Sequence, residues 1–285
     1  MRILVTGHCG YVGRHLLPVL EGRGHAIDGI DILDGANILD ADGTFWDVEC
    51  TRPDAVVHLA ALCHAGKSVS DPAKYWQTNA GGTANLLAGL KAVAFSGRFV
   101  LASTLLARHP ESSPYAASKY ACEQMVAAAA RAHGFSAVTL RIANVAGGSD
   151  PTPGRIVPEA CRAARDHSAL TLHGGHPTPD GTCLRDYVHV LDVAEAVCAA
   201  LDAPLGPREA VTLDIGTGAA ASVTGVVEAV CRASGRRIRT EMKAGRPGDV
   251  AEVCADVREA ERVLDWRATR TLGEICQSAW EASGG

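Results

Sequence analysis

A glycine-rich turn between an apolar segment and a helix-forming segment constrains this chain more than any other stretch. Residues 2–6 read RILVT, an apolar run that predicts a buried strand, and residues 14–20 read RHLLPVL, which predicts a helix. The glycines between them follow the spacing GxxGxxG. In such a unit they permit a tight turn, close approach of a pyrophosphate and close helix–strand packing. We therefore predict a dinucleotide-binding turn formed by Gly7, Gly10, Tyr11, Val12 and Gly13.

A second apolar segment, residues 26–30, ends at Asp31. An acid at roughly 20 residues beyond the glycines is where the adenosine ribose hydroxyls of a dinucleotide are bound. Residues 32–34 contain no Arg or Lys, so the 2′-phosphate of NADP would be repelled. The pattern favours NAD as the cofactor.

The composition is that of a globular protein and excludes several classes of function. The 285 residues carry a net charge of −5, which gives no basic patch for nucleic acid. No stretch approaches the ~18 apolar residues of a membrane span, and we expect no signal peptide because the chain opens on a core strand. The ten cysteines include no CxxC pair, which predicts neither a metal site nor a disulfide framework and favours a reducing, cytoplasmic setting.

Predicted strands and helices alternate along residues 1–145, which is typical of a Rossmann-type, doubly wound parallel sheet in an α/β protein. We expect residues 1–145 to form the NAD-binding domain, with segments around 186–216 returning to it. Residues 146–285 are expected to form mainly a smaller C-terminal α/β domain for the substrate.

The next predicted strand, residues 55–61, is apolar throughout and ends in Leu59, Ala60 and Ala61 at the expected cofactor edge. Within it, His58 is expected to be a hydrogen-bonded core residue rather than a catalyst. A helix is predicted over residues 72–95, and it contains Asn79 and the pair Gly81–Gly82. This pair is either a flaw in the helix or a point of close approach to its backbone, for example by the nicotinamide half of the cofactor.

Two hydroxyl residues, Ser103 and Thr104, follow the apolar segment 98–102, at the strand end where open α/β sheets bind ligands. Tyr115 and Lys119 lie four residues apart in the next predicted helix and therefore share a face. An ammonium group beside a tyrosine favours the phenolate and lowers the tyrosine pKa. Tyr115 could then take a proton from a substrate hydroxyl while hydride leaves for NAD, with Thr104 orienting that hydroxyl.

The order of these motifs resembles extended short-chain dehydrogenases/reductases, and more narrowly the nucleotide-sugar epimerases of the UDP-galactose 4-epimerase type. Residues 58–61 (HLAA), Ser113 through Lys119 and especially the stretch 180–194 (DGTCLRDYVHVLDVA) carry the resemblance, which covers nearly the whole chain. It implies contacts to NAD from Gly7, Gly10, Tyr11, Val12, Gly13, Asp31, Ile32, Asn37, Ile38, Leu59, Ala60, Ala61, Asn79, Ser103, Tyr115 and Lys119. It implies contacts to the nucleotide sugar from Thr104, Asn144, Arg185, Arg246 and Asp249, with the arginine forks matched to the diphosphate.

The chain departs from this family pattern at several places. The connection between Asp31 and His58 is short, and Asn37 stands where an Asp commonly touches adenine. The loop 105–112 is shorter than usual, which suggests a more open site or an unusual sugar. Leu105 and Leu106 follow Thr104 where the related 4,6-dehydratases carry an acid pair, which argues against a dehydratase and against a decarboxylase. Cys63 replaces a lysine that the 4-epimerases often carry, and we expect it to be an ordinary lining residue.

The sequence thus predicts an NAD-dependent nucleotide-sugar 4-epimerase that oxidises C4, lets the 4-keto sugar turn and reduces it from the other face. The alternative within the superfamily is an NAD-dependent reductase or dehydrogenase of a modified nucleotide sugar. A catalytically silent NAD-binding regulator is disfavoured by the intact Thr104, Tyr115 and Lys119. We expect a homodimer formed through the helices around 77–93 and 115–132, which are rich in alanine. The sugar, most simply a UDP-hexose, is not specified by these residues.

Overall fold

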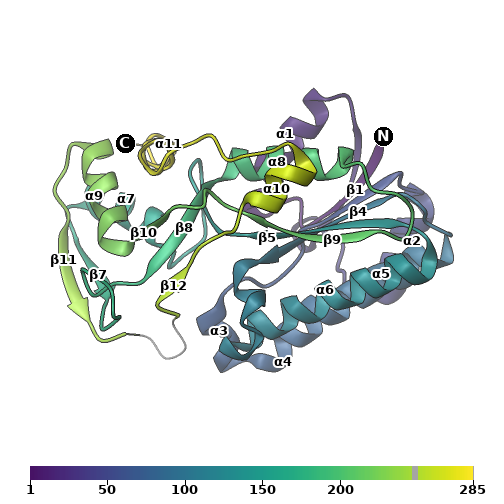
Figure 1. The fold of residues 1–285 in the computed structure, drawn as a ribbon, viewed down its shortest axis with the longest axis horizontal. Coiled ribbons are helices and arrows are strands. Elements are labelled where there is room, and N and C mark those ends of the chain that lie inside the picture. Colours follow the sequence, from purple (N-terminus) through teal and green to yellow (C-terminus); the bar gives the residue numbers. More distant parts are fainter. Residues whose placement is uncertain (246–249, 285) are drawn as a thin grey trace. The chain divides into compact units, whose positions relative to one another are not determined.

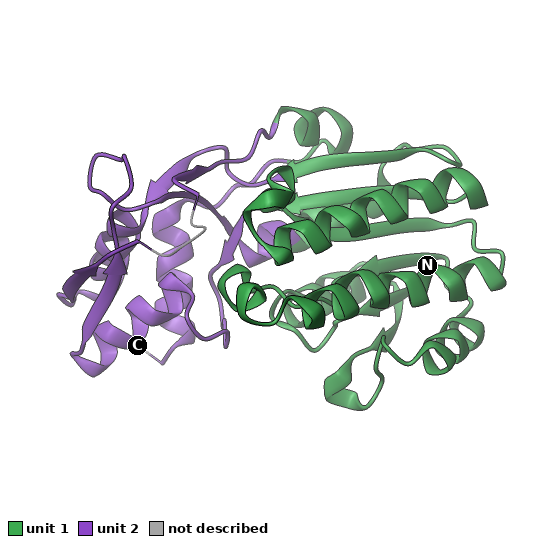
Figure 2. Ribbon diagram, turned by 90° about the horizontal axis from the view of Figure 1, so that it is seen from below, with its two compact units in different colours: residues 1–142, 194–214, 258–266 green, residues 143–193, 215–257, 267–285 purple. Residues whose placement is uncertain are grey.

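The computed structural model describes residues 1–245 and 250–284. The chain forms two compact units, each built from several segments (Figure 2). Unit 1 comprises residues 1–142, 194–214 and 258–266, and unit 2 comprises residues 143–193, 215–257 and 267–285. Each unit has a hydrophobic core of its own.

Unit 1 is built on a parallel sheet, and its six strands in the described residues follow the order β2-β1-β3-β4-β5-β9. The strands are β1 (Arg2–Thr6), β2 (Ala26–Ile30), β3 (Ala55–His58), β4 (Arg98–Thr104), β5 (Ser136–Ile142) and β9 (Ala210–Ile215). The apolar residues of β1, β3 and β5 are buried because helices cover both faces of the sheet, whereas β2 is largely exposed. Figure 1 shows α5 and α6 along one face of the sheet, with α1 and α8 on the other. The predicted Rossmann-type fold is confirmed.

The helices of unit 1 lie between and after these strands. They are α1 (Tyr11–Gly22), α2 (Ala41–Thr51), α3 (Ala65–Ser70), α4 (Pro72–Tyr75), α5 (Gly82–Ala92), α6 (Pro114–His133), α8 (Val190–Asp202) and α10 (Arg258–Leu264). Single tight turns cover Ile32–Asp34 (η1), Leu105–Arg108 (η3) and Pro110–Ser112 (η4). Helix α6 begins where Ser113 accepts a hydrogen bond from the N–H of Ala116, and it ends at Gly134 with a φ of 93°.

The sheet of unit 1 ends at β2. In the usual doubly wound order another strand lies outside this position. Here the described segment between Asp31 and β3 contains only η1 and α2. The short connection noted in the sequence therefore removes an outer strand and leaves β2, which is largely exposed, at the margin of the sheet.

The helix predicted over residues 72–95 is divided by a π-helical turn over Trp76–Gly81 (η2). A Cβ added to Gly82 would lie 2.8 Å from Cγ2 of the buried Ile38. At Gly81, in contrast, the nearest such atom is the carbonyl oxygen of Trp76 at 4.0 Å. The close approach to this glycine pair is therefore made at Gly82 by a core side chain, Ile38.

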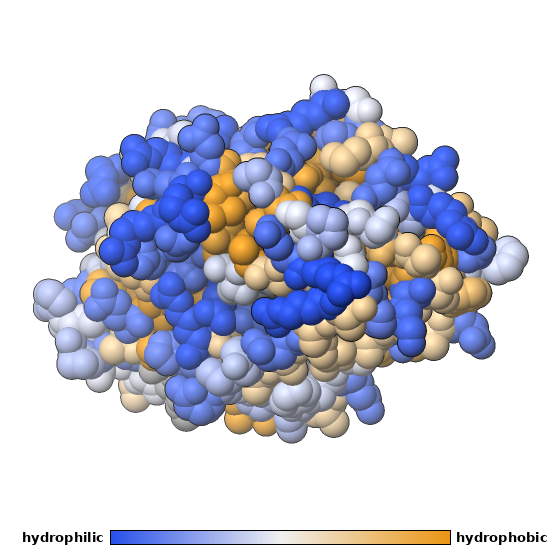
Figure 3. Space-filling view, turned by 45° about the vertical axis from the view of Figure 1, so that its right-hand side comes forward, coloured by the Kyte–Doolittle hydropathy of each residue, from blue (hydrophilic) through white to orange (hydrophobic). Residues whose placement is uncertain are grey.

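Unit 2 centres on β8 (Leu184–His189). This strand pairs with β6 (Asn144–Ala146), β10 (Ala220–Ser222) and β12 (Glu252–Val253), while β7 (Ala169–His173) pairs with β11 (Arg239–Lys243). Helices α7 (Ile156–Asp166), α9 (Val223–Ser234) and α11 (Leu272–Ala282) share one apolar core. No helix of the described residues is long and apolar enough to cross a membrane. The face shown in Figure 3 is largely hydrophilic, with hydrophobic side chains in separate patches.

Candidate active site

The glycine turn after β1 has the geometry that the sequence predicts. Gly7 has a φ of +74°, and a Cβ there would lie 2.6 Å from the backbone nitrogen of Ala60. A Cβ on Gly13 would lie 2.4 Å from the carbonyl oxygen of His8. The residue that precedes α1 is Gly10, which has no side chain to cap the helix, so the N–H groups of the first turn can serve an anion. Such a turn fits a pyrophosphate.

Asp31 directly follows β2. Its carboxylate accepts hydrogen bonds from the backbone N–H groups of Cys9, at 2.9 Å, and Leu33, at 3.0 Å. These bonds hold the side chain beside the glycine turn. The neighbouring Ile32 and Leu33 are 70% and 77% exposed, so an apolar surface is available beside the carboxylate. This combination suits the ribose and base of an adenosine.

The predicted contacts Asn37 and Ile38 face different surroundings. The Asn37 side chain accepts a hydrogen bond from the N–H of Leu39, and Ile38 is buried against Gly82 with its carbonyl oxygen bound by Asn85. The side chain and the carbonyl oxygen of Ile38 are thus engaged within the protein.

A second group beside the cofactor turn was not recognised in the sequence. The His8 ring packs on Gly29, where a Cβ would lie 2.3 Å from Cε1, and His8 Nε2 lies 2.8 Å from Asp34 Oδ2. Potential ligand atoms of His8, Cys9 and Asp34 lie within 4.8 Å of one another. By geometry these three side chains could hold a metal ion. The contact of His8 with Asp34 connects the glycine turn to η1, which follows β2.

His58 is a core residue, as expected. Its Nδ1 lies 2.6 Å from Oγ1 of Thr6, and its Nε2 lies 3.0 Å from Oγ1 of Thr83. Because the Thr83 hydroxyl donates to the carbonyl oxygen of Asn79, the imidazole donates to Thr83 and accepts from Thr6. Burial, followed by the charge of Lys119, lowers the pKa of His58 to about 3. The imidazole is therefore neutral and structural.

Asn79 connects the segment after β3 to α6. Leu59 and Ala60 bond back to Thr6, which fixes the loop carrying Leu59, Ala60 and Ala61. The Asn79 side chain exchanges two hydrogen bonds with the backbone of Leu62 and donates a third to Ser118. Asn79 is 1% exposed, so its side chain is a buried link between the loop after β3 and α6.

Tyr115 and Lys119 lie on one face of the first turns of α6, which starts just beyond Thr104 and the two turns η3 and η4. The N–H of Tyr115 donates to Ser68, its carbonyl oxygen accepts from Ser118, and its ring makes an edge contact with Tyr75. The exposed fractions are 8% for Tyr115 and 4% for Lys119. Burial lowers the pKa of Lys119, and the nearby Cys122, Glu123 and Cys63 partly oppose this effect. The helix thus places a buried tyrosine and a buried lysine on one face.

Ser103, a predicted cofactor contact, has a different partner. Its hydroxyl donates to the buried carboxylate of Glu123 at 2.5 Å. Sequence reasoning missed Glu123, and the only local signal for it was its position one helical turn after Lys119.

The substrate residues predicted in unit 2 are placed by β6 and β8. Asn144 begins β6 and is exposed, opposite Tyr187 of β8. Arg185 lies on β8, and its guanidinium donates to the carbonyl oxygens of Leu184 and Ala251. The other two predicted contacts, Arg246 and Asp249, lie outside the described residues.

Two polar residues of β8 hold loops of unit 2 in place. The carboxylate of Asp186 is 1% exposed and accepts hydrogen bonds from Thr217, Gly218 and Ala255. His189 accepts from the N–H of Leu191 and lies 2.8 Å from the hydroxyl of Ser278. Both side chains are engaged in holding loops in place.

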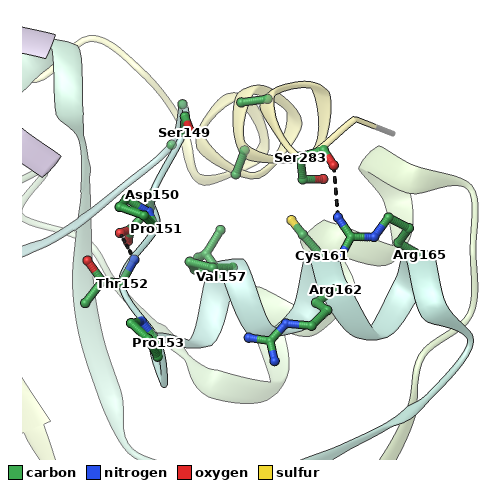
Figure 4. A pocket seen from close by; sticks show the side chains of 15 residues that line it. Ser149, Asp150, Pro151, Thr152, Pro153, Val157, Cys161, Arg162, Arg165 and Ser283 are labelled. Atoms are coloured by element: carbon green, nitrogen blue, oxygen red, sulfur yellow. Dashed lines mark hydrogen bonds between the residues drawn. The ribbon is translucent and has the colours of Figure 1, made fainter. Parts of the chain in front are cut away.

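Unit 2 also has a cavity of about 300 Å³ (Figure 4). It is lined by the loop 147–153, one face of α7 and the end of α11. The side chains of Arg162 and Arg165 line it from α7, and Arg165 donates to the carbonyl oxygen of Ser283. Asn144 and Arg185 are not part of its lining, so we do not assign the nucleotide sugar to it.

Comparison with known proteins defines the class of this chain. The NAD dependent epimerase/dehydratase family matches residues 3–216, and the chain belongs to this family. It is 31% identical to the UDP-glucose 4-epimerase of Bacillus subtilis, over 98% of this chain and 96% of that protein. It is 33% identical to the UDP-glucose 4-epimerase of Streptomyces lividans, over 98% and 95%.

A solved structure supports the same assignment at the level of the fold. UDP-glucose 4-epimerase from Bifidobacterium longum, in complex with NAD⁺ and UDP, aligns with a TM-score of 0.92 over 100% of this chain and 98% of that one, at 26% identity. The resemblance drawn from the sequence motifs is confirmed, and the family description includes the predicted dependence on NAD.

Proposed function

We propose that this protein is an NAD-dependent 4-epimerase of a nucleotide sugar, most simply of UDP-glucose and UDP-galactose. The observation that carries the proposal is the placement of Thr104, Tyr115 and Lys119 at the end of β4 and the start of α6, in a chain similar along its length to UDP-glucose 4-epimerases. NAD, when bound, accepts hydride from the sugar carbon and returns it.

The described residues fit this cofactor. A Cβ at Gly7 or Gly13 would clash with neighbouring backbone, so the tight turn and the close helix packing of a pyrophosphate-binding turn require glycine at both positions. Asp31 is held at the adenosine end with no basic residue in η1 for a 2′-phosphate. We assign the phosphates to the turn and to the start of α1, the ribose to Asp31, and the apolar contact to Ile32 and Leu33.

Tyr115 removes the proton from the C4 hydroxyl as the carbon is oxidised, and it returns the proton when the 4-keto sugar has turned. Thr104 hydrogen-bonds the same hydroxyl and fixes its direction. Lys119 stabilises the phenolate and binds the nicotinamide ribose. Acid–base catalysis of this kind contributes about 10²- to 10⁴-fold to a rate. We assign Asn144, Arg185, Arg246 and Asp249 to the nucleotide sugar, with the guanidinium groups at its diphosphate.

The proposed assembly is a cytoplasmic homodimer. Trp76 on η2 and Tyr120 on α6 are 43% and 39% exposed, on the elements that we expect to pair. All ten cysteines are free thiols, as suits a reducing compartment.

The first test is to incubate the purified protein with UDP-glucose, UDP-galactose and their N-acetyl forms. Sugar interconversion and the absorbance of reduced nicotinamide are followed together. Interconversion without net NADH supports the epimerase. Net production or consumption of NADH would support the alternative, a reductase or dehydrogenase of a modified nucleotide sugar.

The tyrosine is tested by Tyr115→Phe. This change removes the proton acceptor and should lower kcat about 10³-fold while NAD still binds. Full turnover in this variant would exclude Tyr115 as the group that takes the proton.

A further inference from the structure

Behind the proposed catalytic residues lies a buried ionic group to which the proposed mechanism assigns no role. Glu123 of α6 is 2% exposed. Its carboxylate accepts the Ser103 hydroxyl at 2.5 Å and two donors of the Arg141 guanidinium, Nε at 3.0 Å and Nη2 at 2.6 Å. The bidentate geometry is the strong form of this ion pair.

This group connects the elements that carry the site. Ser103 and Arg141 are directly paired across β4 and β5, so their side chains reach the same face of the sheet. Thr104 follows Ser103 on β4. On α6, Glu123 comes one turn after Lys119 and two turns after Tyr115, on the same face. A single carboxylate therefore joins the strand end of Thr104 to the helix of Tyr115 and Lys119.

Glu123 also acts on Lys119 through its charge. Burial lowers the pKa of Lys119, and Glu123 is among the groups that raise it again. Hydrogen bonds to Glu123 raise the pKa of Arg141, so the guanidinium stays charged. Other titratable or polar groups lie near the Glu123–Arg141 ion pair, Lys119 and Tyr115 on the elements packed around them. They are Cys63, Tyr75, His58, Ser103, Tyr120 and Cys122.

We propose that Glu123 is a positioning residue of this site, which fixes the distance between Thr104 and the Tyr115–Lys119 pair and, together with Arg141, sets the local charge that this pair experiences. The inference rests on the proposed function for the identity of the catalytic residues. It goes beyond that function because the proposed mechanism gives Glu123 no contact with cofactor or sugar, so that Glu123 acts through Ser103, Arg141 and Lys119.

The charge is tested with Glu123→Gln in the NAD-loaded protein. Loss of one negative charge beside a retained Arg141 makes the surroundings more positive, which favours the deprotonated form of both Tyr115 and Lys119. Both limbs of the kcat–pH profile should move to lower pH by about one unit. The double change Glu123→Gln with Arg141→Gln removes one charge of each sign and should return the profile toward that of the wild type.

The matched control is Asp192→Asn. Asp192 is also a buried carboxylate, with a 3% exposed side chain paired with Arg270, and it lies in unit 2. This variant should lose thermal stability as Glu123→Gln does, while both limbs of its profile stay in place. A shift of equal size in the control would show that general destabilisation moves the limbs and would overturn the role of Glu123.

The positioning is tested with Glu123→Asp, which keeps the charge and withdraws the carboxylate from Ser103 by about one bond. A misplacement of this order should lower kcat about tenfold with KM and the pH limbs unchanged. This variant leaves no unpaired charge, so it remains informative if Glu123→Gln does not fold. Full kcat in Glu123→Asp would contradict the proposed link.

A readout independent of sugar turnover separates this inference from the proposed function. The five tyrosines are labelled with ¹³C at Cζ, and Tyr115 is assigned by its absence in Tyr115→Phe. Its titration in the NAD-loaded protein should move about one unit lower in Glu123→Gln. If the Tyr115 titration shifts in Glu123→Gln but the wild type turns over no nucleotide sugar, the role of Glu123 stands and the epimerase is rejected. If the wild type turns over normally and the Tyr115 titration does not shift in Glu123→Gln, only the inference about Glu123 is rejected.

Discussion

Backbone contacts constrain some glycines of unit 1 more than others, and the glycine motif in the sequence does not show which. Gly7 and Gly24 both have positive φ angles, +74° and +77°. Only Gly7 is enclosed, since a Cβ there would meet the backbone of Ala60, while nothing lies within 4 Å of a Cβ at Gly24. Substitution of either glycine would therefore cause the same conformational strain. Only at Gly7 would the added Cβ also clash with neighbouring backbone.

This difference predicts distinct outcomes for two alanine variants. Gly24→Ala should cost about 1–2 kcal/mol of stability, which is the strain of a left-handed conformation. Gly7→Ala should cost more than that and should abolish NAD binding, because the turn must move. Urea unfolding and titration with NAD measure both effects. Equal losses of stability, with NAD binding intact in Gly7→Ala, would refute the role of the turn.

The buried His58 predicts a dependence of stability on pH. Its folded pKa of about 3 lies below the ordinary value of 6.5, so between these values the unfolded state binds the extra proton. The stability that it contributes is present above pH 6.5 and is lost as the pH falls. From pH 7 to pH 5 the loss should be about 2 kcal/mol. His58→Gln, which has no such titration, should show a smaller loss by urea unfolding, and an equal loss would mean that other groups are responsible.

At the scale of elements, local patterns predicted most of unit 1. The strand, glycine turn and helix over residues 2–22 follow from short-range signals, and so does α6 with its Ser113 cap. No local pattern marked the π-helical turn within residues 72–92. The tight contact at Gly82, directly after this turn, is made by a residue far away in the chain. Gly82 is glycine because Ile38, from another segment, fills the space beside it.

The glycine pair in this helical segment therefore gives a sharp comparison. Glycine to alanine in a helix usually stabilises by about 1 kcal/mol. Gly81→Ala should follow this rule, because its added Cβ meets no tight contact. Gly82→Ala should instead destabilise the protein by roughly 1–3 kcal/mol, since the core must accommodate an extra methyl group against Ile38. Thermal unfolding of both variants decides the point, and a stabilising Gly82→Ala would contradict the tight contact between Gly82 and Ile38.

For the whole molecule, the sequence predicted the fold class and the family, and it placed Tyr115 and Lys119 on one helix face. The sequence did not predict the contacts between residues far apart in the chain. The Ser103–Glu123–Arg141 group and the His8–Asp34 contact join residues from different elements, and no local pattern marks them. The same holds for α10, residues 258–264, which lies in unit 1 although the chain has already passed through unit 2.

The proposed homodimer predicts a change of mass in solution. Trp76→Glu with Tyr120→Glu places charges on the helices that we expect to pair and should give a monomer by light scattering. Trp46→Glu on α2, where the side chain is 66% exposed, is the control and should leave the dimer intact. A wild-type protein that is already monomeric at working concentration would remove the proposal.

The sheet of unit 1 ends at β2, and Asp31 follows this last strand directly. The adenine of a bound cofactor would consequently lie at the rim of unit 1, beside the exposed Ile32 and Leu33, and no further strand of the described residues would enclose it. A linker attached to that base would lead straight into solvent. An agarose resin that carries NAD through its adenine should therefore retain this protein on a column and release it when free NAD is added.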